Sequence, residues 1–399
     1  MTAGTFEPAR GGRPARVLAV LLVLALILFS FHLSGIPGEG RVLAFAVLAG
    51  GLFGLALQRS RFCFFCVTRD FLDRRDARGL LGIVAALAVG MLGYHVLFSV
   101  FLPVPAAGRL PPGAHIGPVS YVLAVAAFVF GLGMAISGSC ISAHLYRLGE
   151  GALASPFALL GALLGFGLGF LCWNVLYLDA IQAAPIAWIP AWTGSYGLSL
   201  LLQLGLLGVL ALLLWRQHVA PEGPPARSSE AHPLLGRWPV WVGGLLIGFL
   251  GVMSYFRYAP LGVTAELGSL ARTAGSGLGW IPSRLEGLDG FAGCATVLKE
   301  TLFSPNGVFV IGLVLASWAS ALAAGEFKPV RPSGRDVARN FVGGILLGWG
   351  SMLALGCTVG TLLSGVMAGA ASGWLFAAAC LAGIWTGWRA RQWVGRRLG

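Results

Sequence analysis

The cysteines of this chain are the residues whose position suggests chemistry. Seven cysteines occur among 399 residues, and three of them, Cys63, Cys140 and Cys357, lie near glycine or arginine where an apolar run is interrupted. A thiol is a weak hydrogen-bond donor and a polarizable partner, so it suits a soft sulfur atom better than a hard oxygen. Three thiols along one path would therefore pass on a sulfur-containing anion without holding it too tightly.

Other residues around these cysteines are candidates for the same path, whereas Cys172 and Cys380 lie inside apolar runs and act only as small hydrophobic side chains. Arg61 either anchors the inner end of a helix or attracts the anion at its exit. Glu150 is expected to form a structural ion pair with Arg147. The further path residues are Gly138, Gly356 and Arg61, and the additional candidates are Cys294, Cys66, His144 and Thr264.

Two other uses of the cysteines stay open at this point. Cys63 and Cys66 form a CxxC pair, which suits a thiol-disulfide oxidoreductase, and together with Cys140 and His144 they would supply the ligands of a Cys3His zinc site. The sequence contains no P-loop, HExxH or GxSxG motif. We therefore expect no catalytic residue, no metal and no cofactor. An assembly or scaffold protein, in which no cysteine matters for function, is the third alternative.

The composition decides which kind of fold must position these residues. Hydrophobic residues make up 57% and charged residues 11% of the chain, with a mean hydropathy of +0.83, whereas soluble domains carry about 25% charged residues. The 60 glycines and 13 tryptophans suit helices that pack closely within a lipid bilayer. We predict an all-α integral membrane protein, and we exclude a soluble enzyme, a disulfide-rich secreted domain and a disordered protein.

Ten apolar runs are long enough to be candidate membrane spans. With the N-terminus in the cytoplasm, 21 of the 27 lysines and arginines lie inside, as the positive-inside rule requires. The net charge of +12 then reflects cytoplasmic loops, and no nucleic-acid partner is expected. We predict a multi-pass protein of the cell inner (plasma) membrane with both termini cytoplasmic. The runs are 17–34, 42–58, 79–102, 118–137, 154–178, 196–215, 240–256, 306–324, 341–356 and 370–388.

A shared register of glycine and cysteine predicts an internal repeat. Gly131 and Gly348 each lie nine residues before a cysteine, and the glycines near residue 50 resemble those near residue 244. Five spans on each side of a linker would turn the second copy over, which gives an inverted repeat of the kind common in transporters. The expected organisation is a cytoplasmic tail over 1–16, a first half over 17–215, a cytoplasmic linker over 216–239, a second half over 240–388 and a basic cytoplasmic tail over 389–399.

Four segments between the spans are too short or too polar to cross lipid, and we expect them to form re-entrant half-helices. Their N-termini would offer partial positive charge and free N–H groups to a small anion. Several shallow sites suit passage of a divalent anion better than one tight site, because the anion must also leave. The four segments are 59–70, 138–150, 259–270 and 357–366.

Three local patterns combine glycine, arginine and cysteine: residues 58–63 read QRSRFC before Arg69-Asp70, residues 131–151 contain GLG…GSC…YRLGEG, and residues 343–360 contain GG…LGCTVG. They resemble the QRxRFC…RD, GLG…GGC…YRxGEG and GG…GGCxxG segments of the YeeE/YedE family of sulfur-compound transporters. Residues 261–264 are similar to a fourth segment. Ser139 and Leu355 replace glycines of this pattern, and Cys66 and the stretch 271–300 are not part of it.

The resemblance implies uptake of thiosulfate into the cytoplasm through an hourglass-shaped protein with an inverted repeat, in which three cysteines line the path. The matching positions here are Cys63, Cys140 and Cys357. The family also implies a small cytoplasmic sulfur carrier of the TusA type as a partner. Because the family includes branches linked to selenium and to other sulfur species, those substrates are alternatives to thiosulfate.

Overall fold

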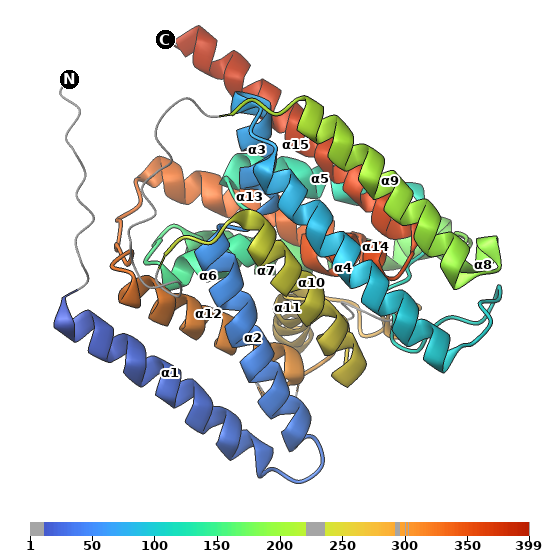
Figure 1. Ribbon diagram of the computed structural model, residues 1–399, viewed down its shortest axis with the longest axis horizontal. Coiled ribbons are helices and arrows are strands. Elements are labelled where there is room, and N and C mark those ends of the chain that lie inside the picture. The colour runs from blue at the N-terminus through green and yellow to red at the C-terminus, as the bar shows by residue number, and fades with distance from the viewer. Residues whose placement is uncertain (1–11, 221–235, 292–295, 300, 302, 399) are drawn as a thin grey trace.

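The protein is a bundle of helices, which confirms the expected all-α fold class. The computed structural model describes residues 12–220, 236–291, 296–299, 301 and 303–398, and these residues form helices and no β-strand. Figure 1 shows that most of the long helices share a common tilt. In chain order they are α1 (Arg13–Ser34), α2 (Gly40–Ser60), α3 (Phe64–Arg74), α4 (Arg78–Phe101), α5 (Tyr121–Ser137), α6 (Ile141–Gly149), α7 (Ser155–Leu176), η1 (Tyr177–Ile181), α8 (Ile189–Thr193), α9 (Tyr196–Arg216), α10 (Val240–Arg257), α11 (Thr264–Gly277), η2 (Leu288–Gly290), α12 (Pro305–Ala323), α13 (Gly334–Leu353), η3 (Thr358–Ser364), α14 (Gly365–Met367) and α15 (Ala371–Leu398).

Each of the ten expected spans coincides with a long helix. Within the described ranges, eight helices are long and apolar enough to cross a membrane, and α13 joined to η3 and α14 across a 42° bend would be a ninth. The tenth expected run lies on α15, which is not among these helices and continues through the basic segment expected as a separate tail. Two of the eight candidates, Gly40–Arg74 and Tyr121–Gly149, contain a break, because they join α2 to α3 and α5 to α6.

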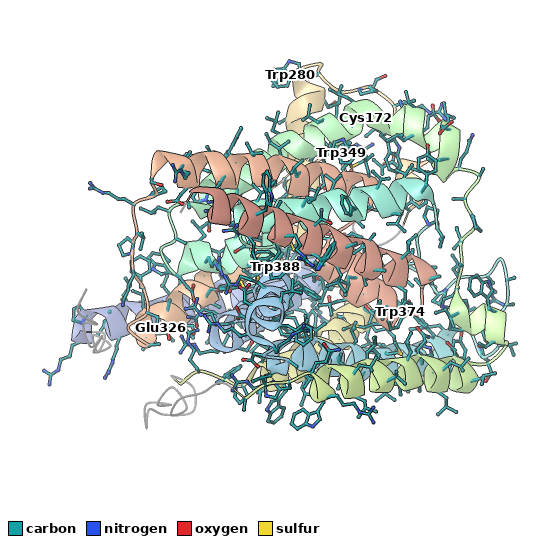
Figure 2. All side chains as sticks on the ribbon, turned by 90° about the horizontal axis from the view of Figure 1, so that it is seen from above. Cys172, Trp280, Glu326, Trp349, Trp374 and Trp388 are labelled. Carbon is teal, nitrogen blue, oxygen red and sulfur yellow. The ribbon has the colours of Figure 1, made fainter. Side chains whose placement is uncertain are left out.

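The long helices form two groups, and each group combines helices from before and after the linker at 216–239. In the first group α2 packs against α12 and α4 packs against α10, with α1 and α9 on the outside. In the second group α5 packs against α15 and α7 packs against α13. Figure 2 shows the second group on one side, marked by Cys172, Trp349, Trp374 and Trp388.

Glycines bring the paired helices into backbone contact, as small residues do in membrane proteins. A Cβ atom added at Gly54 of α2 would lie 2.2 Å from the Leu313 carbonyl oxygen of α12, and one at Gly244 of α10 would lie 2.1 Å from the Gly82 oxygen of α4. The second group repeats this arrangement: at Gly131 of α5 the Cβ would meet α15, and at Gly344 and Gly348 of α13 it would meet α7. The glycines whose sequence register resembles one another thus occupy corresponding contacts.

The expected division into five spans on each side of the linker is wrong, because six of the ten apolar runs already lie before residue 216. Six long helices precede it, namely α1, α2, α4, α5, α7 and α9, and four follow it. The helix contacts instead make α2, α4, α5 and α7 the counterparts of α10, α12, α13 and α15. Helix α2 packs on α12 as α10 packs on α4, and α5 packs on α15 as α13 packs on α7. Helices α1 and α9 are not part of this match. The matched helices α2 and α10 run in opposite directions. The start of α10 lies beside the end of α2, where the Trp238 N–H donates to the Arg59 oxygen.

The short helices lie between the two groups. Helix α6 contacts α12 of the first group and α7 of the second, and α11 contacts α12 and α7. Helix α3 contacts α4 and α15, while η3 contacts α15 and α4. The predicted half-helix segments therefore lie at the interface of the two groups, and helices of both groups hold their side chains in place.

Candidate functional site

The three candidate cysteines occupy the same local position, the residue before a short helix. Cys63 precedes α3, Cys140 precedes α6 and Cys357 precedes η3, and each has an extended backbone. Residues with positive φ turn the chain just before them: Arg61 at 54°, Gly138 at 86°, and Leu355 and Gly356 at 54° and 151°. Gly138 and Gly356 therefore serve to break the helix, since glycine adopts such angles without strain, and the cysteine follows at the new N-terminus.

Cys63 and Cys140 lie together. Their side chains are within hydrogen-bonding range of each other, and Cys63 is also within range of Cys66. The Cys140 thiol additionally pairs with the Ser142 hydroxyl at 3.2 Å. We call Cys63, Cys66 and Cys140 the inner thiol cluster.

Cys357 lies with the residues of the fourth break rather than with the other two thiols. The Val359 N–H donates to its sulfur at 3.4 Å, and its side chain lies near Thr264, the first residue of α11. The fold thus brings Thr264 close to Cys357, while the Thr264 hydroxyl itself has no hydrogen-bond partner among the described residues. Behind this break, His115, Leu355 and Thr361 line a cavity of about 10 Å³, which has room for about one water molecule.

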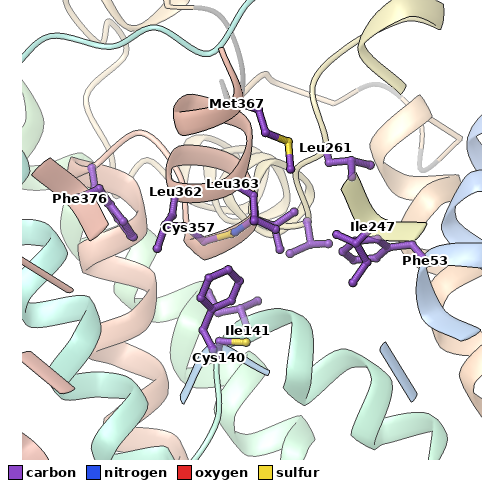
Figure 3. Packing of buried hydrophobic residues seen from close by; sticks show 14 of the residues in the cluster. Phe53, Cys140, Ile141, Ile247, Leu261, Cys357, Leu362, Leu363, Met367 and Phe376 are labelled. Atoms are coloured by element: carbon purple, nitrogen blue, oxygen red, sulfur yellow. The ribbon is translucent and has the colours of Figure 1, made fainter. Parts of the chain in front are cut away.

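Both thiol sites are closed to solvent. Cys63, Cys140 and Cys357 are 0–1% exposed, and they belong to one continuous apolar cluster. Figure 3 shows Cys140 and Cys357 on opposite sides of a layer of packed apolar side chains. Packed side chains therefore separate the site around Cys357 from the inner thiol cluster.

Arg147 is a site residue that the sequence analysis missed. Its guanidinium donates to the Cys66 sulfur at 3.1 Å and to the Ser139 hydroxyl, so it lies against the inner thiol cluster. The expected ion pair between Arg147 and Glu150 is wrong, because Glu150 instead accepts from Arg61 and Gln58. The signal was present in the spacing: Arg147 follows Cys140 by seven residues, which is two turns along the same face of α6.

His144 lies one turn after Cys140, as predicted, and is 3% exposed. Neither of its ring nitrogens has a hydrogen-bond partner among the described residues. A search of the described part of the chain finds no group of three His, Cys, Asp or Glu side chains that could hold a metal ion. Cys294 lies outside the described residues.

A cluster of charged residues closes one end of the site, and we call it the inner charge cluster. Glu326 accepts from Arg59 at 2.6 Å and from Arg237 at 2.8 Å, and Gln58 bridges Glu326 and Glu150. Arg61 points to Glu150, 3.3 Å away, and its side chain is 47% exposed. Arg61 therefore belongs to this cluster rather than to the thiols. Burial lowers the pKa of Arg237 from its ordinary value.

A comparison with known protein families places the chain in one of them. Residues 59–386 match the family described as sulphur transport. The chain belongs to this family. The matched range contains all four breaks and the helices from α3 to α14, so the family assignment rests on most of the chain and not on one motif.

Relatives within the sulphur transport family cover most of the chain. The thiosulfate transporter TsuA of Spirochaeta thermophila is 29% identical over 357 residues, which cover 85% of this chain and 96% of the relative. The thiosulfate transporter TsuA of Escherichia coli is 25% identical over 379 residues, or 90% and 94% of the two chains. A shorter match, 32% over 85 residues and 21% of each chain, links it to the probable transporter YedE of Escherichia coli.

These relatives confirm the predicted family, and they confirm a transporter of sulfur compounds rather than an enzyme. Together with the apolar helices they also establish a multi-pass membrane protein. The thiol-disulfide oxidoreductase and the scaffold protein that the cysteines left open are therefore not favoured.

Proposed function

We propose that this protein imports thiosulfate, or a closely related sulfur-containing anion, through a path lined by Cys63, Cys140 and Cys357. The observation that carries the proposal is the placement of each of these thiols at the start of a buried short helix between the two helix groups. The TsuA relatives support thiosulfate as the anion.

The helix N-termini supply what a dianion needs in a site without water. The described helices α3, α6 and α11 begin without a side-chain cap, so their first N–H groups are available to an anion, and the helix dipole adds partial positive charge. The thiols provide weak, polarizable contacts for the terminal sulfur. Such contacts let the anion bind at each site and leave again.

Transport in this proposal requires the two helix groups to move. Because the thiols are closed to solvent on both sides, the anion enters when the outer site around Cys357 and Thr264 opens, and leaves when the inner thiol cluster opens. The antiparallel match of α2 with α10 supports an inverted repeat as the basis of this alternation.

The orientation and the surroundings are part of the proposal. The excess of lysine and arginine in alternate loops supports the inner membrane with both termini cytoplasmic. A small cytoplasmic carrier of the TusA type would receive the sulfur compound at the inner side. Sulfur or selenium species other than thiosulfate are alternative substrates at the same thiols.

The test is uptake of radiolabelled thiosulfate into proteoliposomes containing the purified protein, with Cys140→Ala and Cys357→Ala as variants. We expect each variant to lose most of the uptake, by about tenfold or more, because each loses a thiol that meets the sulfur on the proposed path. Cys172→Ala is the control, since Cys172 is exposed on α7. Wild-type uptake rates in both Cys140→Ala and Cys357→Ala would refute the thiol path, and absence of uptake by the wild type would refute thiosulfate as substrate.

A further inference from the structure

We propose that the inner thiol cluster and Arg147 together form a two-ended binding site, which holds the terminal sulfur of the anion at the thiols and its sulfonate oxygens at the guanidinium. This inference rests on the proposed function. It adds Cys66 and Arg147 to the site, and it defines the anion class as one that carries a sulfur end and an oxygen end.

The first observation is that Arg147 has no carboxylate partner. Among the described residues no ion pair includes Arg147, and its guanidinium donates instead to the Cys66 sulfur and the Ser139 hydroxyl. The nearest acidic residue in the sequence, Glu150, is occupied by Arg61 and Gln58. A cation that is largely removed from water and lacks a counter-charge is costly, and a bound dianion would remove that cost.

The second observation is the arrangement of the thiols around this cation. Cys63 lies within hydrogen-bonding range of Cys140 on one side and Cys66 on the other, so three sulfur atoms adjoin, and the last of them is in contact with the guanidinium 3.1 Å away. An anion whose sulfur lay among the thiols would therefore place its oxygens toward Arg147. Guanidinium groups bind two oxygens of an oxyanion in parallel.

The third observation is an unused polar side chain at the same place. His144 lies on α6 between Cys140 and Arg147, it is 3% exposed, and both its ring nitrogens lack a partner among the described residues. Buried polar groups of this kind are rare unless a ligand satisfies them. His144 is therefore available to donate to the oxygen end of the anion.

A site with these two ends would favour an anion that carries both sulfur and oxygens over one that carries only one of them. Sulfate offers oxygens to Arg147 but no soft atom to the thiols, and hydrosulfide offers sulfur but no oxygens to the guanidinium. Either competitor would engage half of the site. Cys66, which is more exposed than the other two thiols, would be the last sulfur contact before release.

Equilibrium binding of radiolabelled thiosulfate to the full chain in detergent tests the inference. We expect Cys66→Ala and Arg147→Gln each to raise the dissociation constant by about tenfold or more, since each removes a contact to a charged ligand. Arg147→Lys should recover part of the affinity, because it restores the charge without the paired donors. Cys380→Ala is the matched control: Cys380 is a buried thiol that lies on α15, outside the inner thiol cluster.

Competition with unlabelled sulfate or hydrosulfide tests the oxygen end and the sulfur end of the site separately. Excess sulfate or hydrosulfide should displace little thiosulfate from the wild type. Wild-type affinity in both Cys66→Ala and Arg147→Gln would overturn the inference, and if Arg147→Gln does not fold, unchanged affinity in Cys66→Ala alone overturns it. The proposed function would still stand in that case, provided that Cys140→Ala and Cys357→Ala abolish uptake.

Discussion

At the scale of single residues, the site depends on where the chain leaves the helical conformation. Arg61, Gly138 and Gly356 each adopt a positive φ just before a cysteine, so the thiol lies at a helix N-terminus instead of on a helix face. Polar residues next to these breaks form hydrogen bonds to them. His115, for example, pairs with Thr361 of η3 at 3.2 Å, close to the break that carries Cys357.

His115 should make the stability of the protein depend on pH. Burial lowers its pKa to about 4, whereas a histidine in the unfolded chain has a pKa of about 6.5. The unfolded state therefore binds the proton first, so this contribution to stability is complete above about pH 6.5 and is lost as the pH falls toward 4. We expect the thermal midpoint of His115→Gln in detergent to fall less steeply than that of the wild type between pH 6.5 and 4.5. Parallel slopes would contradict this account.

At the scale of the helices, glycine determines how closely they pack. Gly54, Gly131, Gly244 and Gly344 each meet the backbone of the partner helix, so the four main helix pairs approach to backbone contact. The close approach of the paired helices fixes the positions of the helix breaks, which lie between the two groups.

Gly54→Ala should destabilise the pair of α2 and α12. Its Cβ would lie 2.2 Å from the Leu313 oxygen, so the helices must separate, and overpacking of this kind costs about 1–3 kcal/mol. Thermal unfolding in detergent, followed by tryptophan fluorescence, should show a lower midpoint. Gly205→Ala on α9 is the control, because nothing lies within 4 Å of its Cβ. Equal midpoints for the two variants would show that α2 and α12 tolerate the extra methyl group.

The sequence predicted the helices well, because apolar length is a local feature, and it placed Cys63, Cys140 and Cys357 at breaks between helices. It did not predict which helices pair. The count of spans on each side of the linker suggested two separate halves, but packing joins α2 to α12 and α7 to α13. It also missed Arg147, because the carboxylate of Glu150 three residues away suggested an ion pair, whereas the fold turns Glu150 toward Arg61.

At the scale of the whole molecule, the inner charge cluster joins segments that are far apart in the sequence. Gln58 and Arg59 come from α2, Glu150 follows α6, Arg237 precedes α10, and Glu326 follows α12. This cluster lies at the end of the molecule next to the inner thiol cluster. In the proposed transport cycle, opening of that end would break or rearrange some of these contacts.

Glu326→Gln should loosen this closure. Removing one partner of a buried ion pair costs about 3–5 kcal/mol, and because Glu326 is itself 25% exposed we expect an effect toward the lower end. A maleimide reagent should then modify Cys66 faster in the variant than in the wild type, and the thermal midpoint should fall. Glu286→Gln is the control, since its ion pair with Arg284 is largely exposed. Unchanged rates and midpoints in Glu326→Gln would mean that the cluster does not hold the inner end shut.

The crossing of the helix pairs also bears on how the protein is made. Each tight contact of α2, α4, α5 and α7 is with a helix that the ribosome synthesises later. A nascent chain that has inserted only α1, α2, α4, α5, α7 and α9 would leave the glycine faces of α2, α4, α5 and α7 against lipid. These helix pairs therefore form only after the helices that follow the linker have been inserted, and α15 completes the contact with α5.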